Sequence, residues 1–553
     1  MKLNYKKTFY VGLAFLLITL FWRTYDLIIA KILIDKFGLN QFVSGIIMSL
    51  DNVLALFLIP LFGSLSDKKK SKRGRRTPYI IVGTIIAAFA FLSLTFADNF
   101  QQAKIESETA IVEEYNDFYD NNLEYDFTDW QDLRDGIILQ WQELKDDGVI
   151  DQEAYDSFYE EVIDGDDTGD ETNPDALDYE KDNREGMNEI FTYSAGDLDN
   201  EDLKDLRELY YLHLNKRAWI VTSRSPFTFI VFMVVLLAAL LSMATFRSPA
   251  VALMPDVTIK PLRSKGNAVI NLMGTVGGII ATVMLMAFAL DGRSYVNYAP
   301  AFIITSALML VLLAIFLWKV KEPKLVKEKE EMDKQYNLVE VEEESEVQEK
   351  LPAAKRKSLL LILFSVALWF IGYNAVMSKL SDYAPKVLGL DYGLPIIIAQ
   401  MAALIAFIPI GILATRIGRK KTILIGIIAL TVCFGTVYFL TPSTAFLMYI
   451  IFALTGVAWA TINVNSYPMV VELAKGSDVG KYTGYYYTFS MSAQIVTPIL
   501  SGLLMDSFGR TILFPYAALF VLSSFVTMFF VKHGDFKAPK KGDVLESFDV
   551  DVD

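Results

Sequence analysis

The sequence predicts an all-α membrane protein with twelve transmembrane helices arranged as two halves of six. Three observations lead to this prediction: an apolar composition, regularly spaced apolar runs, and a loop motif that occurs once in each half. Of the 553 residues, 53% are hydrophobic. The mean hydropathy is +0.35, which is high for a soluble protein of this length.

Twelve apolar runs follow one another along the chain. Each run is about 20 residues long, the length that a helix needs to cross about 30 Å of hydrocarbon. The runs cover residues 9–34, 41–63, 78–97, 226–253, 268–290, 299–318, 358–378, 392–414, 422–440, 443–466, 483–505 and 512–531. The first is not a signal peptide, because it continues through Trp22, Arg23 and Asp26 without a small-residue cleavage site. The single cysteine, Cys433, excludes an internal disulfide.

Basic residues gather in alternate loops, which predicts the orientation of the helices. The stretches KKKSKRGRR, KPLRSKG and RIGRKK and the basic segment after the sixth run all fall on one side of the membrane. Cytoplasmic loops accumulate Lys and Arg, so we expect this side, with both termini, to be cytoplasmic. The predicted location is therefore the cell membrane, with a multi-pass chain.

Charge divides the chain into regions. The net charge is −14, but residues 98–217 alone hold 37 acids and 9 bases, or −28. We expect the chain to have five parts. They are a first helical half at 1–97 and 226–318, an acidic extracytoplasmic insertion at 98–225, a cytoplasmic linker at 319–357, a second helical half at 358–531 and an acidic tail at 532–553.

A short motif appears at matching places in the two halves. The second run is followed by GSLSD and then GRR, and the eighth run ends in GILATRIGRKK. This pattern resembles the Gly-x-Leu-Ala-Asp-Arg-x-Gly-Arg-Lys signature of the major facilitator superfamily. The second copy has Thr415 where the signature has Asp, whereas the first copy keeps Asp67. The resemblance implies two six-helix bundles, which is a recurring transporter design.

Two further stretches are similar to the sucrose/proton symporters and the glycoside–pentoside–hexuronide cation symporters of that superfamily. One is GRRTPYI after the second run, and the other is SPAVALMPDV at the end of the fourth. Val251 stands where those carriers have Arg, and Arg247 lies one turn earlier on the same helix face.

The resemblance implies that the basic loops form a cytoplasmic gate that is made in one conformation and broken in the other. An alternative for the lysines of the first loop is that they set topology and contact anionic lipid. The expected gate residues are Asp67, Gly74, Arg75 and Arg76 in the first half, Arg247 near the cytoplasmic end of the fourth run, and Arg416 and Arg419 in the second half.

Ionisable residues inside apolar runs are candidates for function, because each costs at least about 2.5–3.5 kcal/mol to insert. Arg23 and Asp26 are three residues apart and share a helix face, and Asp51 reaches a similar depth on the next run. We predict that Asp51 or Asp26 carries a coupling proton, with Arg23 tuning it. The alternative is a static Arg23–Asp26 pair that joins helices.

Amide and aromatic side chains inside the runs fit a sugar, whose hydroxyls need directional partners and whose C–H face stacks on rings. The predicted solute-binding residues are Trp22, Asn52, Trp369, Tyr373, Asn374, Gln400 and Gln494. Each amide, taken singly, fits equally well as a bond between helices. Three glycines in the fifth run, Gly274, Gly277 and Gly278, indicate close helix packing.

The insertion is predicted to contain helices. Trp130, Leu133, Ile137, Trp141 and Leu144 recur at helical spacing, and residues 203–214 also have a helical pattern. A further stretch, DGDDTGDETNPD, resembles an EF-hand loop and would hold Ca²⁺ as the only cofactor. Its ligands would be Asp164, Asp166, Thr168 and Asp175. The alternative is a solvated acidic loop that matches the motif by chance.

These observations predict a secondary active transporter, not an enzyme, that couples a sugar or glycoside to protons by alternating access. The expected partners are a small polar solute, a proton or other monovalent cation and the lipid bilayer, with no nucleic acid, and we expect a monomer. Two alternatives stay open: an efflux carrier for drugs or metabolites, and a membrane sensor whose insertion binds a ligand or partner. The glycine-rich GTVGG lacks the Gly-Lys-[Ser/Thr] ending of a phosphate loop, so energy is expected from an ion gradient.

Overall fold

The computed structural model describes residues 4–69, 71–121, 127–159, 162, 202–259, 263–290, 292–335, 352–471, 473 and 479–534. These residues form helices and connecting turns. The helices are α1 (Tyr5–Lys31), η1 (Ile32–Lys36), α2 (Gln41–Lys68), α3 (Thr77–Thr109), α4 (Ile111–Asn121), α5 (Phe127–Asp146), α6 (Gln152–Phe158), α8 (Asp202–Arg224), α9 (Phe227–Val257), α10 (Arg263–Ala287), α11 (Ala299–Lys319), α12 (Glu322–Gln335), α13 (Ala353–Leu388), α14 (Gly393–Ile417), α15 (Arg419–Val437), η5 (Pro442–Thr444), α16 (Leu447–Val471), α17 (Val479–Phe508), η7 (Arg510–Ile512) and α18 (Leu513–Phe529).

The prediction of an all-α fold with twelve apolar spans is confirmed. Within the described residues, 10 helices are long and apolar enough to cross a membrane, and two shorter apolar segments, Leu272–Ala287 and Gly393–Phe407, lie where the fifth and eighth spans were expected. Side-chain caps fix the start of the first two spans. The side chain of Asn4 accepts from the Lys7 N–H at 3.2 Å, and that of Asn40 accepts from the Val43 N–H at 2.8 Å.

The described chain divides into two compact units. The first holds the residues up to the end of α12 together with Ser378–Gly393 and Ile499–Arg510, and the second holds the described remainder. The C-terminal ends of α13 and α17 therefore pack with the first half of the sequence. The third span also runs past its expected end at residue 97, because α3 continues to Thr109. Its charge at Asp98 does not end the helix, since Lys36 neutralises it at 2.6 Å in a fully buried pair.

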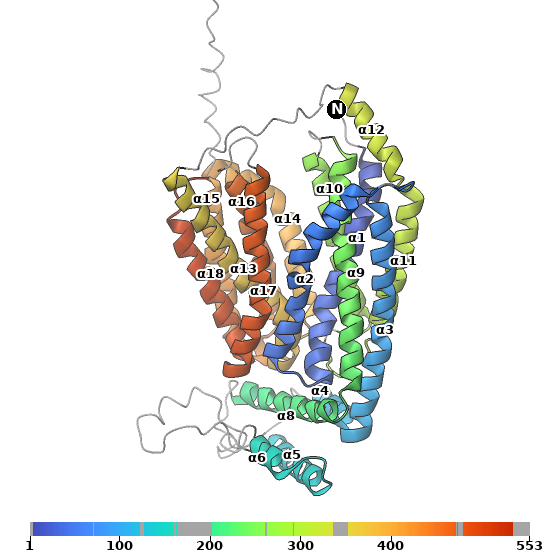
Figure 1. The fold of residues 1–553 in the computed structure, drawn as a ribbon. Coiled ribbons are helices and arrows are strands. Elements are labelled where there is room, and N and C mark those ends of the chain that lie inside the picture. The colour runs from blue at the N-terminus through green and yellow to red at the C-terminus, as the bar shows by residue number, and fades with distance from the viewer. Residues whose placement is uncertain are drawn as a thin grey trace, which may run out of the picture. The chain divides into compact units, whose positions relative to one another are not determined.

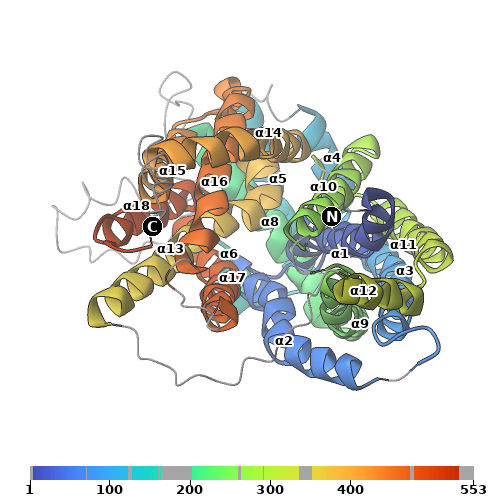
Figure 2. The same cartoon turned by 90° about the horizontal axis from the view of Figure 1, so that it is seen from above.

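Small residues set the close helix contacts of the first unit. A Cβ added at Gly277 of α10 would lie 2.5 Å from the Leu16 carbonyl oxygen of α1, and one at Gly83 of α3 would lie 2.5 Å from the Phe246 Cβ of α9. Figure 2 shows α1 beside α10 and α3 beside α9 in the view along the helices. Gly277 therefore packs helices, as the sequence predicts, instead of binding a ligand.

Helices α4, α5, α6 and α8 form a small helical body at one end of the first unit, called the insertion end (Figure 1). The predicted helices over 130–144 and 203–214 are confirmed by α5 and α8. Their core is aromatic: the rings of Trp141 and Phe158 stack at 3.8 Å between centroids, and those of Phe118 and Tyr210 lie 4.0 Å apart. The opposite end of the unit, with residue 4, the loop at 69–76 and α12, is called the basic end.

Candidate functional site

Charged side chains from three helices meet inside the first unit, in a group called the central cluster. It comprises Arg23 and Asp26 of α1, Asp51 of α2 and Arg247 of α9. Asp26 interacts electrostatically with both arginines, and Asp51 interacts with Asp26 and Arg247. The structure thus brings together Arg23, Asp26 and Asp51, the residues predicted from the sequence to act in proton coupling.

Arg247 was expected at the cytoplasmic gate, and the structure places it in the central cluster instead. Its guanidinium carbon lies 5.7 Å from the centre of the Trp22 ring. The physical reason is that α9 extends to Val257, so Arg247 lies three turns before the helix ends. Trp22 therefore lies beside the central cluster, and its ring makes a cation–π contact with the Arg247 guanidinium.

Polar atoms around the central cluster lack partners among the described residues. The indole Nε1 of Trp22 and the hydroxyl of Tyr25 are buried and make no hydrogen bond. The Asn52 side chain donates to Asp51 Oδ1 at 2.7 Å. Buried donors usually have a partner in native proteins, so these two atoms are available to a bound molecule or water.

The central cluster is loosely bonded. Asp26, Asp51 and Arg247 are half-buried, and in the described part of the chain no ion pair within 4.0 Å joins either aspartate to Arg247. Asp26 and Asp51 therefore act on Arg247 across gaps. A carboxylate can take up a proton, whereas a guanidinium cannot, so Asp26 and Asp51 are the titratable members.

A second group of charges, the insertion-end network, is fully buried and tightly bonded. Lys386 of α13 contacts Asp35 of η1 and lies 2.7 Å from Asp382. Arg510 donates from Nε to Asp382 Oδ2 at 2.8 Å. These four side chains are all less than 10% exposed. The chain Asp35–Lys386–Asp382–Arg510 fixes the C-terminal ends of α13 and α17 to the first helices.

The start of α2 is bonded into the same network. The Asp506 carboxylate of α17 accepts from the backbone N–H groups of Gln41 and Phe42 at 2.7 and 2.6 Å. The Gln41 side chain donates to Asp382 at 2.6 Å and accepts from Lys379 at 2.8 Å. A carboxylate at a helix N-terminus is favoured by the helix dipole, so α17 caps α2.

None of the insertion-end residues was among the sites predicted from the sequence. The seventh span was ended at residue 378, so the charges beyond it were counted as a loop. A signal was present, since Lys379, Asp382 and Lys386 recur at spacings of three and four, which is one face of a continuing helix. Asp35 and Arg510 are single charges at helix ends, and only the fold brings them together.

The expected gate loop of the first half is bonded to two acids that the sequence analysis did not select. Asp256, at the end of α9, binds Arg75 at 2.6 Å and Arg76 at 2.8 Å. Glu322, at the start of α12, accepts the Thr77 N–H at 2.8 Å and the Arg75 N–H at 2.7 Å. Gly74 has φ +101°, and a side chain there would overlap Glu322, so the loop requires glycine.

Other predicted gate residues are only partly described. The side chains of Asp67 and Arg416 lie outside the described residues. Arg419 is half-buried at the start of α15, and its neighbour Lys420 donates to the carbonyls of Phe529 and Val531 at 2.7 and 2.6 Å. The loop of the second half is therefore bonded to the end of α18, which contains the final span.

The second unit holds the predicted aromatic residues on α13. Tyr373 stacks on Trp459 of α16, with ring centroids 3.7 Å apart and planes at 5°. The indole Nε1 of Trp369 and the Nδ2 of Asn374 are buried donors without a hydrogen-bond partner among the described residues. Trp459 was not selected, although it lies in the tenth apolar run as Trp369 lies in the seventh, because the sequence does not show which aromatic residues pair.

The two predicted glutamines are less informative. Gln494 of α17 donates from Nε2 to the Ser490 carbonyl at 3.3 Å, one turn back on its own helix. Gln400 lies half-buried on α14. The proposed calcium ligands Asp164, Asp166, Thr168 and Asp175 lie outside the described residues.

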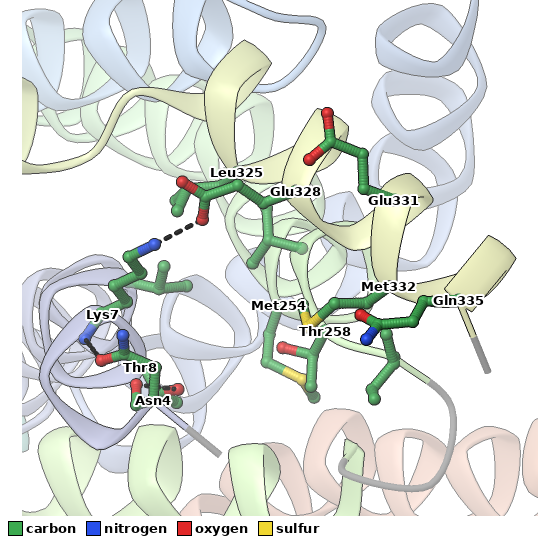
Figure 3. A pocket seen from close by; sticks show the side chains of 13 residues that line it. Asn4, Lys7, Thr8, Met254, Thr258, Leu325, Glu328, Glu331, Met332 and Gln335 are labelled. Carbon is green, nitrogen blue, oxygen red and sulfur yellow. Dashed lines mark hydrogen bonds and ion pairs between the residues drawn. The ribbon is translucent and has the colours of Figure 1, made fainter. Parts of the chain in front are cut away.

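A separate pocket of about 440 Å³ lies at the basic end, between α1, α9 and α12 (Figure 3). Lys7 reaches across it to form an ion pair with Glu328. Met254, Leu325 and Met332 supply apolar lining. It contains no residue of the central cluster, so its size does not make it the candidate site.

The insertion holds one more polar group, at its core. Trp141 donates to His213 Nδ1 at 2.9 Å, and because indole is only a donor, the ring proton of neutral His213 resides on Nε2 and faces Glu114 at 3.1 Å. Arg217 pairs with the same carboxylate. Burial lowers the pKa of His213. Burial alone would raise the pKa of Glu114, but the His213 bond and the Arg217 charge outweigh it and lower that pKa to about 2.

Ten helices long and apolar enough to cross a membrane, with two shorter apolar helices among the described residues, indicate a multi-pass membrane protein. The sequence profile of the Major Facilitator Superfamily matches residues 218–408 and 390–546, and that of the MFS/sugar transport proteins matches residues 10–112. The chain therefore belongs to the major facilitator superfamily. No curated protein sequence matches it.

Solved structures share the fold at low sequence identity. A D-xylose–proton symporter is 12% identical with a TM-score of 0.54, over 95% of this chain and 98% of that one. A bacterial homologue of the iron transporter ferroportin, in an inward-facing state, is 12% identical with a TM-score of 0.53, over 96% and 99%. The nucleoside transporter NupG is 11% identical with a TM-score of 0.50, over 95% and 99%.

Proposed function

We propose that this chain is a secondary active transporter that couples the entry of a sugar or glycoside to protons by alternating access. The observation that carries the proposal is the central cluster, where Asp26 and Asp51 lie with Arg247 inside apolar helices. Buried ionisable groups in membrane helices are costly and are kept where they carry ions or protons.

The proton step follows from the composition of the cluster. With both acids ionised, two carboxylates balance two guanidinium groups, and protonation of one acid leaves a net positive charge. A solute hydroxyl bound near Asp51 then meets a different field in each protonation state. Such a difference in binding between states is what couples one equilibrium to the other.

The proposal that the solute is a sugar is supported by buried hydrogen-bond donors and by aromatic rings. Each unit, taken by itself, offers such groups. Trp22 of the first unit has a buried donor without a partner among the described residues, and in the second unit Trp369 and Asn374 do too, while Tyr373 stacks on Trp459. Sugar hydroxyls accept hydrogen bonds from such donors, and sugar C–H faces pack on such rings. We further propose that the basic end faces the cytoplasm of a cell whose plasma membrane holds the protein, since its loops carry the Lys and Arg excess.

Uptake into proteoliposomes tests this function. A panel of radiolabelled sugars is offered with and without an inward proton gradient, and Asp51→Asn is compared with the unaltered chain. We expect gradient-driven uptake to fall at least about tenfold in Asp51→Asn, because the amide cannot take up a proton. Asp147→Asn, the same change at an exposed position of the insertion, is the control and should transport normally. Unchanged coupling in Asp51→Asn would exclude Asp51 from proton transfer.

A further inference from the structure

Helix α8 of the insertion is bonded firmly to the first helices of the chain. Asn215 donates from Nδ2 to the Ile34 carbonyl at 2.8 Å and to the Leu39 carbonyl at 3.3 Å. Gln101 of α3 donates to Thr222 at 3.1 Å. The C-terminal half of α8 therefore moves with η1 and α3, and Figure 1 shows the helix lying across the ends of α1 and α2.

The N-terminal half of α8 reaches the insertion-end network. The Glu208 carboxylate accepts the Arg510 backbone N–H and lies 3.8 Å from its guanidinium. One turn further along α8, the Tyr211 ring centre lies 5.3 Å from the Lys386 ammonium. Glu208 and Tyr211 thus contact both cations of the network, and both cations come from the later half of the sequence.

The contacts with Glu208 are of the kind that breaks when a carrier opens. The four side chains of the Asp35–Lys386–Asp382–Arg510 chain are buried, so the helix ends that carry them are packed together at the insertion end. In an alternating-access cycle, a solute can pass this end only when α13 and α17 separate from η1 and α2. Separation also has to break the Glu208–Arg510 contact, because α8 stays with η1.

We propose that α8 is a latch, with Glu208 as its contact, that stabilises the state in which the insertion end is closed. The inference rests on the proposed transport cycle and assigns the insertion a role in it. The latch shifts the balance between closed and open states without touching the central cluster. A substitution at Glu208 then changes access from the insertion end and leaves the binding groups intact.

Accessibility of a buried serine measures the latch directly. Ser381 is 2% exposed beside Asp382 in the network, and Ser381→Cys in a Cys433→Ser background gives a single reactive thiol. The rate of its reaction with a polar maleimide is compared in detergent between Glu208 and Glu208→Gln chains. We expect about tenfold faster labelling in Glu208→Gln, since a bond to a charged group is lost from the closed state.

Three controls make the result decisive. Glu153→Gln removes an exposed carboxylate of the insertion and should leave the rate unchanged. Cys433, buried in α15, reports unfolding in a chain without the introduced cysteine, and its labelling should stay slow in Glu208→Gln. Ser44→Cys, at a fully buried position of α2, repeats the measurement should Ser381→Cys not fold.

Equal labelling rates in Glu208→Gln and Glu153→Gln, or a rise matched by Cys433, would overturn the latch. The assay uses neither solute nor proton gradient. A failed sugar uptake experiment therefore refutes the proposed function without affecting this result, and a failed labelling experiment refutes the latch alone.

Discussion

The first unit contains two groups of buried charge that differ in how they are bonded. In the insertion-end network, Asp382 holds Arg510 at 2.8 Å and Lys386 at 2.7 Å, and all three side chains are buried. In the central cluster, Asp26 and Asp51 are half-buried and act on Arg247 across gaps. In the first group each charge has an ion-pair partner. In the second, no ion pair within 4.0 Å joins either aspartate to Arg247 among the described residues, which leaves capacity for a proton or a solute.

This difference separates a structural role from a chemical one. A buried charge with a close ion-pair partner stabilises one arrangement of helices, and it resists change because breaking the pair leaves an ion without a partner. A charge without a close partner contributes less to any one arrangement, so it can change its protonation state or bind cargo. We therefore expect substitutions in the insertion-end network to lower stability, and substitutions in the central cluster to lower transport with little change in stability.

The largest expected effect on stability is that of Asp382→Asn. The change leaves Arg510 and Lys386 without their shared carboxylate in a buried site, which costs about 3–5 kcal/mol when one partner of a buried pair is removed. Thermal unfolding in detergent should show a markedly lower midpoint than that of the unaltered chain. Asp147→Asn, at an exposed position, should unfold like the unaltered chain, and a loss below about 1 kcal/mol in Asp382→Asn would contradict the assignment.

Glu114 of the insertion is a paired carboxylate outside the membrane-spanning helices. The pH dependence of its contribution tests whether paired charges stabilise the fold. The pKa of Glu114 is lowered from 4.5 to about 2, so its contribution is present above about pH 4.5 and is lost as the pH falls toward 2. The pKa of His213 is also lowered, so stability already declines as the pH drops below 6.5. The Glu114 part amounts to about 3 kcal/mol, at about 1.4 kcal/mol for each unit of pKa.

Near-UV circular dichroism of the full chain between pH 7 and pH 3 measures this acid unfolding of the insertion core. Glu114→Gln should be less stable at pH 7 and should lose less stability between pH 4.5 and pH 3 than the unaltered chain. Glu153→Gln, whose carboxylate is exposed, should keep the full pH dependence. Equal slopes in Glu114→Gln and the unaltered chain would show that the Arg217 and His213 contacts do not stabilise this core.

The sequence predicts the periodic parts of this molecule and misses the contacts between distant residues. Apolar runs about 20 residues long predicted the twelve spans, and the three-residue spacing of Arg23 and Asp26 predicted a shared face. Arg247 was assigned to the gate, and its interaction with Asp26 and Asp51 was not predicted, because the end of α9 was placed too early. Asp35 and Lys386 are 351 residues apart in the sequence, so no local sequence pattern predicts that they pair.

A smaller effect is expected from the aromatic pair in the second unit. Trp459→Leu keeps an apolar side chain but removes the ring that stacks on Tyr373 at 3.7 Å, and such pairs contribute about 0.5–1.5 kcal/mol beyond the burial of the ring. Stability should fall by at least that amount, while the apparent KM for the transported sugar rises by more than the stability loss explains. Cys433→Ser is a neutral comparison in the same unit, and an unchanged KM in Trp459→Leu would remove the stack from the solute site.

The smallest stability change, and the sharpest test of the comparison, is expected from Asp26→Asn. Removing this carboxylate loses its attraction to Arg23 and Arg247 but also its repulsion from Asp51, and the opposed terms leave a net change below about 1 kcal/mol. Its unfolding midpoint should therefore stay near that of the unaltered chain, while proton-driven uptake is lost. A large loss of stability, like that of Asp382→Asn, would instead make Asp26 a structural ion-pair partner. The two groups of charge would then be alike, and Asp51 would be left as the sole candidate proton carrier of the central cluster.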